Sequence, residues 1–157
     1  QALQGNVAQL RELHAAMGEV AQGNEAVRRL RTVCGCGLIL ALSLAAEIGD
    51  IWRFPQPRHL RGYSGLTPRV SQSGDKTHIG PLTRKGNPYL RHALILVAQH
   101  VAQSKQIAGT RLKRFYGRHL GRHGANPAKV ALARKLCDIL FAMLRNETDF
   151  DLQRLAT

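Results

Sequence analysis

The sequence predicts a mainly α-helical domain that contains a helix-hairpin-helix-like element and a short irregular β-hairpin or loop insertion. Leu and Ala are abundant while only 5% of the 157 residues are aromatic, a composition that favours helices over a β-sandwich. Apolar residues recur at three- and four-residue steps in several segments, which is the spacing of one helix face. The stretch 70–79 instead has β-prone residues at both ends and Ser, Gly and Asp near its middle, which is typical of a hairpin or a long loop.

The first 22 residues form the first predicted element, an amphipathic linker helix. Apolar side chains follow helical spacing from Leu3 to Val20, and their steps resemble a short coiled-coil seam. Two heptads are too few to establish a coiled coil, so packing onto the chain's own domain and dimerisation both remain open. We therefore divide the chain into this helix, residues 1–22, and one helical domain, residues 23–157.

A glycine-containing turn between two helices comes next. A short helix is expected over residues 25–32, and a strongly apolar helix from Leu38 to Ile48. Between them lie Gly35 and Gly37, which alternate with apolar residues as in the hairpin of helix-hairpin-helix modules. Backbone N–H groups at such a turn can hold a DNA phosphate without reading sequence, so both glycines are candidate nucleic-acid contacts. The alternative is a tight turn without a ligand.

Two Asn-Pro pairs mark helix starts later in the chain. Asn87-Pro88 begins a long helix and Asn126-Pro127 begins the last one, because Asn caps a helix and Pro fits its first position. A basic helix is expected between them, over about residues 110–120. The tail from residue 146 onward is expected to fray.

Charge is distributed unevenly along the chain. Lys and Arg number 23 against 10 Asp and Glu, which gives a net charge of +13. Residues 1–50 are nearly neutral, whereas the 62 residues from Lys76 to Cys137 contain 13 Lys or Arg and no acidic residue. Such a surface suits a polyanion, and nucleic acid is the expected partner. The alternatives are a merely basic protein or packing against RNA of the ribosomal kind.

Hydroxyls, glycines and cations alternate from Tyr63 to Arg91, where small residues would let a DNA backbone approach closely. A serine in this setting could attack phosphorus, because nearby cations stabilise the alkoxide and the charge that develops on the phosphate. Chemistry alone does not rank the serines of this segment, and each could instead be a turn hydroxyl. The serines are Ser64, Ser71 and Ser73, and the cations expected to neutralise phosphates are Arg69, Lys76, Arg84, Lys85 and Arg91.

A series of short motifs carries a family resemblance over most of the chain. They are Cys34-Gly35-Cys36-Gly37, Ala45 to Asp50, Arg53-Phe54, Leu60, Tyr63 to Pro68, Ser73 to Lys76, Gly80, Lys85-Gly86-Asn87, Tyr89 to Arg91, and the later helix Lys129 to Leu144. In this combination the chain resembles the C-terminal, serine-bearing domain of the insertion-sequence transposases that have an N-terminal RuvC-like acidic domain, the bridge-RNA-guided recombinases. Cys34 stands where the family usually has Pro, which is a departure at the turn.

The resemblance implies a role for one serine and a set of partners. Ser73, just before the glycine of the Ser-Gly motif, would be the catalytic nucleophile for DNA strand cleavage and exchange in transposition. The partners would be DNA, a structured guide RNA and further copies of the protein, as a dimer or higher homo-oligomer, in the bacterial cytoplasm. The chain itself would hold no cofactor, while Mg²⁺ would bind carboxylates of the RuvC-like domain in the full-length enzyme. Alone, this chain is expected to bind nucleic acid without transferring strands.

The sequence predicts neither a metal site nor a membrane-spanning segment. Glu47 and Asp50 match family positions, but they lie at a helix end and are expected to be structural. His119 and His123 are four residues apart, yet the Cys34-x-Cys36 spacing is too short for a usual zinc site, so no metal ligands are predicted. The longest apolar run, residues 33–46, is too short to span a bilayer. Three cysteines do not suggest a disulfide framework, and buried thiols in a reducing cytosol are expected.

Two other functions remain open. One is a non-catalytic helix-hairpin-helix module that holds nucleic acid by its phosphates, in which Ser73 has no role. The other is a helical interaction domain that dimerises through residues 3–20, for which any binding should depend little on salt.

Overall fold

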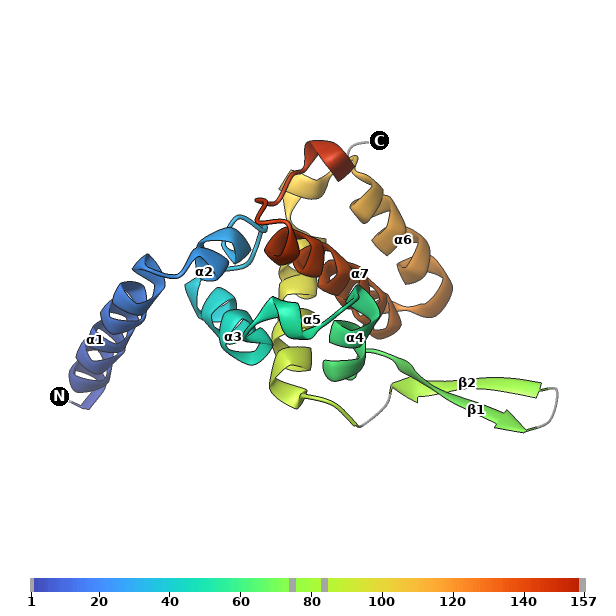
Figure 1. Ribbon diagram of the computed structural model, residues 1–157. Helices are drawn as coiled ribbons and strands as arrows, with labels where there is room; N and C mark the ends of the chain where they lie inside the picture. Colours follow the sequence, from blue (N-terminus) through green and yellow to red (C-terminus); the bar gives the residue numbers. More distant parts are fainter. Residues whose placement is uncertain (1, 74–75, 83–84, 156–157) are drawn as a thin grey trace.

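The helices of the domain pack around one long central helix. The computed structural model describes residues 2–73, 76–82 and 85–155. The outer helices are α2 (Glu25–Leu30), α3 (Leu38–Ile48), α4 (Pro57–Tyr63), α5 (Pro88–Gln103) and α6 (Arg111–His123). The central helix is α7 (Ala125–Arg145), which packs against α2, α4, α5 and α6 (Figure 1). Short 3₁₀ turns occupy Ile51–Arg53, Lys105–Ile107 and Gln153–Leu155. The predicted mainly helical class is confirmed.

The apolar face of α7 contributes a large part of the hydrophobic core. Its buried positions recur at helical spacing, so that one face meets α5 and the other elements throughout its length. On α5 the expected stripe is also buried, from Leu90 to Val101. The buried side chains of α7 are Ala128, Leu132, Ala133, Leu136, Cys137, Leu140, Phe141, Met143 and Leu144.

The N-terminal helix α1 (Ala2–Gln22) extends away from this body (Figure 1). Its predicted helical character is confirmed, but most of its apolar side chains are not covered by the rest of the chain. Leu10, Leu13 and Val20 are 65%, 59% and 69% exposed, whereas Ala21 in the last turn is buried. This face of α1 is therefore without a partner among the described residues of one chain.

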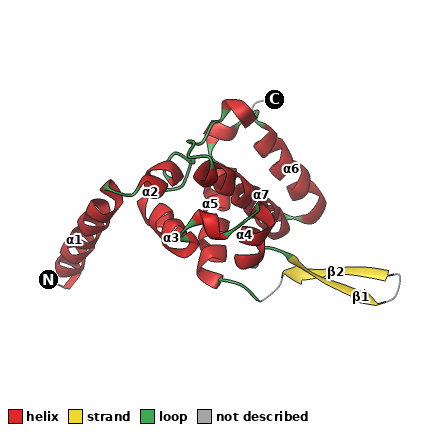
Figure 2. Ribbon diagram, in the orientation of Figure 1, coloured by secondary structure: helices red, strands yellow, loops and turns green. Residues whose placement is uncertain are grey.

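A two-stranded hairpin projects from the opposite side of the body. Figure 2 shows the strands β1 (Pro68–Ser73) and β2 (Lys76–Leu82) leaving the helices as a separate arm. They pair antiparallel, with Val70 opposite Ile79 and Ser73 opposite Lys76, and the register shifts between Pro68 and Val70. This agrees with the irregular hairpin expected from the sequence. We call residues 67–85 the arm.

Two element boundaries, the end of α6 and the start of α7, differ from those expected. Helix α6 continues beyond residue 120 to His123, and Gly124, with a φ of +81°, ends it. That same glycine is the N-cap of α7, so Asn126 lies inside the first turn and does not cap it. Pro127 is tolerated there because the first N–H groups of a helix have no partner within it.

The C-terminal tail is tied to the body, so the expected fraying is wrong for its described part. The backbone N–H of Phe150 donates to Thr32 Oγ1 at 2.8 Å. Arg28 pairs with Asp149 at 3.1 Å, and this contact and Glu25 raise the pKa of the Arg28 guanidinium. Across the described part of the chain, no helix combines the length and apolar character needed to cross a membrane.

Candidate nucleic-acid interface

Two glycines that touch each other, Gly65 and Gly86, flank the arm. Gly65 has a φ of +69° and Gly86 a φ of +119°, conformations that side chains other than glycine rarely adopt. A Cβ on Gly86 would lie 2.7 Å from the nitrogen of Gly65, and one on Gly65 would lie 2.7 Å from the carbonyl oxygen of Lys85. The Asn87 N–H donates to the Tyr63 carbonyl at 2.7 Å. Together these contacts close the base of the arm.

Asn87 connects this base to two helices. Its side-chain oxygen accepts from the N–H groups of Tyr89 and Leu90, both at 3.0 Å, which confirms the predicted cap of α5. Its amide nitrogen donates to the carboxylate of Glu47 on α3 and to the Tyr63 hydroxyl at 3.2 Å. Every polar atom of this side chain is therefore used to hold the arm's base against the body.

Tyr63 is held from its other side by an arginine. The Arg53 guanidinium lies 4.6 Å from the ring centres of both Phe54 and Tyr63, and it donates to the Glu47 carbonyl at 3.3 Å. The hydrogen bond from Asn87, followed by the contact with Arg53, lowers the pKa of the Tyr63 hydroxyl. The family-like motif residues around Tyr63 thus position the arm.

The three candidate serines lie in different environments in the structure. Ser64 is fully buried, and its hydroxyl donates to the Arg61 carbonyl at 2.8 Å, so it is a structural hydroxyl that a DNA phosphate cannot reach. Ser71 and Ser73 both lie in β1, where Ser71 pairs with His78 and Ser73 pairs with Lys76 at the end of the ladder. Pro68 to Ser73 spans about 17 Å of extended strand, so Ser73 lies near the tip, far from the base.

The predicted cations divide between the two ends of the arm. Arg69 and Lys76 belong to the strands, and Lys76 is the register partner of Ser73. Arg84 lies outside the described residues. Lys85 is exposed beside Gly86, while Arg91 in the first turn of α5 is half-buried, with its guanidinium next to Gly65. Lys85 and Arg91 therefore lie at the base, and Lys76 lies near the tip.

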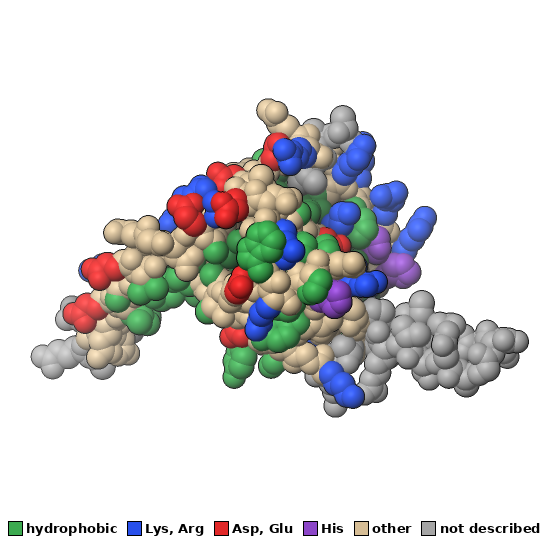
Figure 3. Space-filling view, viewed as in Figure 1, with side chains coloured by type: hydrophobic (Ala, Val, Ile, Leu, Met, Phe, Trp, Pro, Cys, Tyr) green, Lys and Arg blue, Asp and Glu red, His purple; other side chains and the backbone are tan. Residues whose placement is uncertain are grey.

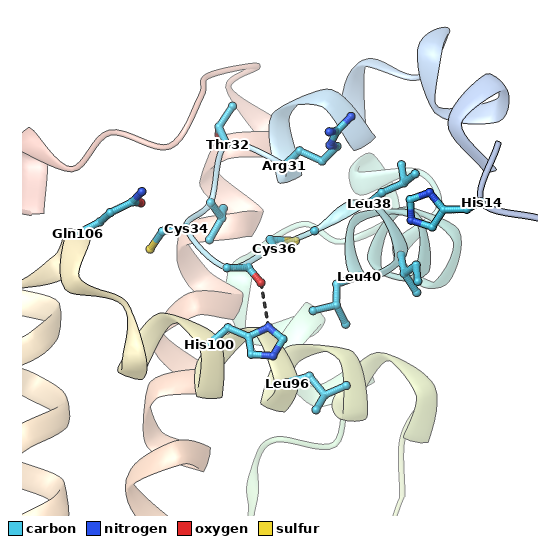
Figure 4. Close-up of a pocket in the computed structure, with 14 residues that line it drawn as sticks. His14, Arg31, Thr32, Cys34, Cys36, Leu38, Leu40, Leu96, His100 and Gln106 are labelled. Carbon is cyan, nitrogen blue, oxygen red and sulfur yellow. Dashed lines mark hydrogen bonds between the residues drawn. The ribbon is translucent and has the colours of Figure 1, made fainter. Parts of the chain in front are cut away.

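Gly35 and Gly37 lie on the other side of the body, in the turn between α2 and α3. A Cβ on Gly35 would come within 2.5 Å of the Cβ of His100, and the Gly35 carbonyl lies 3.0 Å from His100 Nδ1 (Figure 4). Close packing against α5 therefore explains why glycine stands at position 35. Gly37 is the N-cap of α3 and has open space where a Cβ would be. The helix-hairpin-helix assignment and the phosphate contact stay predictions.

Glu47 and Asp50, the acids that match family positions, are engaged within the fold. Glu47 accepts from Asn87, and Asp50 caps the following 3₁₀ turn by accepting from the N–H of Trp52 at 2.9 Å. Asp138 on α7 pairs with Arg61 at 3.1 Å. Within the described ranges, no three His, Cys, Asp or Glu side chains gather as metal ligands would. These three carboxylates each hold elements of the fold together.

Sequence reasoning missed two features of this side of the molecule. The linkage of Glu47, Asn87, Tyr63 and Arg53 escaped it because these residues come from four separate motifs. The second feature is the set of arginines at helical spacing on α6, from Arg111 to Arg122, whose signal was present in the basic stretch but was not assigned to a site.

Comparison with known proteins identifies the family of this chain. The family described as "Transposase IS116/IS110/IS902 family" matches residues 27–116. The chain is 37% identical over 134 residues, 82% of its length, to the transposase for insertion sequence element IS1111A of Coxiella burnetii, covering 36% of that protein. It is 29% identical over 142 residues to the transposase for IS1328 of Yersinia enterocolitica, covering 90% of the chain and 42% of that protein.

A further relative is named as a gene-inverting protein and not as a transposase. The pilin gene-inverting protein of Moraxella bovis is 31% identical over 131 residues, which is 82% of the chain and 39% of that protein. The chain thus spans about two fifths of the length of the relatives it matches. The family match covers more than half of the chain, from within α2 to within α6, and includes the arm. The chain belongs to the IS116/IS110/IS902 family of transposases.

Proposed function

We propose that this chain is the C-terminal part of a DNA transposase in which Ser73 is the nucleophile. The observation that supports this most directly is the end of the β1–β2 ladder, where the backbone of Ser73 lies opposite that of Lys76. The ladder lies on an arm whose base is closed by Gly65, Gly86 and Asn87. A rigid base with a projecting tip lets the tip enter a DNA groove or the active site of another domain.

The proposed step is a transesterification. Ser73 Oγ forms a bond to a DNA phosphorus as the bond from that phosphorus to one deoxyribose oxygen breaks. The hydroxyl proton of Ser73 goes to solvent, and the departing oxygen takes up a proton. One phosphodiester is exchanged for another, so the strand can be rejoined without an external energy source. The cations Arg69, Lys76, Arg84, Lys85 and Arg91 would hold the DNA backbone on either side of this point.

The remaining parts of the proposal concern partners. The IS110-like relatives and the RuvC-type resemblance suggest a separate acidic domain that holds Mg²⁺, since the carboxylates described here are engaged elsewhere. The acid-free stretch from residue 76 to 137 would also suit a structured guide RNA, in the bacterial cytoplasm. Gly35 and Gly37 would hold a phosphate at the turn. The exposed face of α1 suits self-association as a dimer.

Covalent trapping tests the nucleophile. The full-length enzyme is incubated with a nicked suicide DNA substrate, and protein–DNA adducts are counted on denaturing gels for the wild type, Ser73→Ala and Ser71→Ala. Ser71 is the matched control, because it is the same residue type on the same strand, two positions away. We expect adducts from the wild type and Ser71→Ala only. Adducts that persist in Ser73→Ala would refute the assignment.

The competing function is a binding module without chemistry, which the charge distribution alone also supports. Under it, Ser73→Ala would change neither DNA binding nor recombination, and only the removal of cations would matter. Recombination by Ser73→Ala at the wild-type rate would favour that module.

A further inference from the structure

The arginines of α6 lie on one exposed face of the helix. At 100° per residue, positions 111, 114, 118 and 122 fall within about 80° of one another around the helix axis. All four side chains are exposed, and none has an ion pair or hydrogen bond within the described part of the chain. We call Arg111, Arg114, Arg118 and Arg122 the arginine stripe. The opposite face of α6 carries the buried Leu112 and packs on α7.

This stripe weakens the helix that carries it. Arg114, Arg118 and Arg122 follow one another at four-residue steps, where like charges repel. Arg111 lies in the first turn, at the positive end of the helix dipole, and that turn contains no acidic residue. Lys113 of the same helix donates to the Ala102 carbonyl at 2.6 Å, which satisfies a hydrogen bond but leaves its charge in place. The structure of one chain thus leaves this positive charge uncompensated.

Two glycines inside α6 are further evidence that this face of the helix binds a ligand. Gly117 and Gly121 lie in the middle and near the end of the helix, where glycine lowers helix stability. Neither has any atom within 4 Å of the place where a Cβ would be, so packing within the described chain does not require them. Their effect is to remove side chains next to the arginine stripe, which leaves the helix backbone open to a large ligand.

The surroundings of the stripe are positive as well. A hollow of about 710 Å³ beside α6 is lined by Arg111, Arg114 and Arg118 together with Lys135 of α7 and Arg154, and by no acidic side chain. Figure 3 shows Lys, Arg and His side chains gathered over α6, while Asp and Glu side chains gather over α1 and α2 on the other side. The molecule therefore has a positive flank on the side from which the arm projects.

We propose that the arginine stripe is a second DNA-binding surface, which holds the phosphate backbone of duplex DNA away from the arm. From Arg111 to Arg122 the stripe advances by 11 residue steps, about 16 Å of helix axis, which corresponds to about five base-pair steps of a duplex. With one guanidinium on each turn, the face meets successive phosphates and reads no base. The proposal rests on the proposed function only in choosing DNA as the polyanion.

Fluorescence anisotropy of the 157-residue chain with a labelled 20-base-pair duplex tests this surface. The variant Arg114→Gln/Arg118→Gln should weaken binding up to roughly 60-fold at 0.1 M salt. It should also lower the slope of log K against log salt by about 1.8, because each lost phosphate contact removes about 0.9. The matched control is Arg11→Gln/Arg31→Gln, which removes the same charge from exposed positions on the α1–α2 side. Equal losses in the two variants would overturn the proposal.

A second pair of substitutions keeps the charge and tests close approach. Gly117→Gln and Gly121→Gln should raise the melting temperature of the protein, because both remove a helix-weakening glycine, yet they should weaken DNA binding. Unchanged binding in the stabilised variants would contradict the docking geometry.

Further measurements distinguish DNA from RNA as the ligand, and distinguish this surface from the proposed nucleophile. A stripe variant that loses affinity for an RNA duplex of the same length, but keeps its affinity for DNA, would overturn the choice of DNA. If trapping excludes Ser73 while the stripe variants still lose DNA affinity, the nucleophile assignment fails and the stripe stands.

Discussion

At the scale of single residues, Asn87 joins several elements of the fold. It caps α5 with its oxygen, donates to Glu47 and Tyr63 with its amide, and closes the arm with its backbone N–H. The sequence predicts only the cap, because capping is local and shows in the Asn-Pro pair. The contacts with Glu47 and Tyr63 cross 40 and 24 residues, and no local pattern encodes them.

Asn87→Ala should destabilise the protein by about 2–4 kcal/mol, because it removes a helix cap and leaves the Glu47 carboxylate without its donor. Asn87→Ser is the matched control, since serine still caps but has no amide. In urea unfolding, the free energy of unfolding of Asn87→Ser should lie between those of the wild type and of Asn87→Ala. In Asn87→Ser the pKa of Tyr63 should rise towards its ordinary value, which an ultraviolet titration against Tyr63→Phe measures. Equal stability of the Ala and Ser variants would contradict the cap.

Gly86→Ala should open the base of the arm. The new Cβ would meet the backbone of Gly65 at 2.7 Å, and the φ of +119° is strained for alanine, so a loss of at least about 1–3 kcal/mol is expected. Gly62→Ala on α4 is the control, because it has open space and a helical position, and it should stabilise by about 0.5–1 kcal/mol. Chemical denaturation of both variants gives the comparison. A stable Gly86→Ala would show that the two glycines do not touch.

The three cysteines are buried thiols, as expected. Burial raises the pKa of Cys36 and of Cys137 to about 12, from an ordinary value of 9.0. At pH 7 both thiols are largely neutral in the folded and in the unfolded state. Between pH 9 and 12 only the unfolded state ionises, so their contribution to stability is lost across that window. At pH 8 iodoacetamide should label them only after unfolding, and rapid labelling of the folded protein would contradict their burial.

At the scale of elements, α1 and the arm are the two parts that leave the helical body (Figure 1). The helix periodicity of α1 and the β-prone ends of the arm were sufficient to predict both. Their packing could not be predicted, because an amphipathic pattern does not say whether its apolar face meets the same chain or another. In one chain the face is open, with Leu10 and Leu13 more than half exposed.

The open face of α1 predicts a concentration-dependent dimer. Leu10→Asp/Leu13→Asp should convert it to a monomer, measured by light scattering at about 50–100 μM protein, because two carboxylates would be buried in the seam. The control Ala8→Asp/Ala15→Asp adds the same charge to the same helix outside the seam and should leave the dimer intact. A wild-type chain that is monomeric at these concentrations would contradict self-association through α1.

At the scale of the whole molecule, the sequence predicted the charge asymmetry but not its geometry. The acid-free stretch from residue 76 to 137 folds into α5, α6 and most of α7, and its uncompensated arginines collect on α6. Ser64, one of the three candidate nucleophiles, and Gly65, in the segment expected to let DNA approach closely, serve instead to pack the base of the arm. A sequence motif indicates that particular residue types are needed at its positions. The fold then shows whether packing or a ligand is the reason.

The central claim is that the arm carries the nucleophile. Its most direct test is to digest the adduct that the full-length wild-type enzyme forms with suicide DNA and to identify the modified peptide by mass spectrometry. We predict a nucleotide remnant on Ser73, in the peptide that spans β1 and the start of β2. A remnant on any other residue, or on Ser71 in the same peptide, would contradict the account.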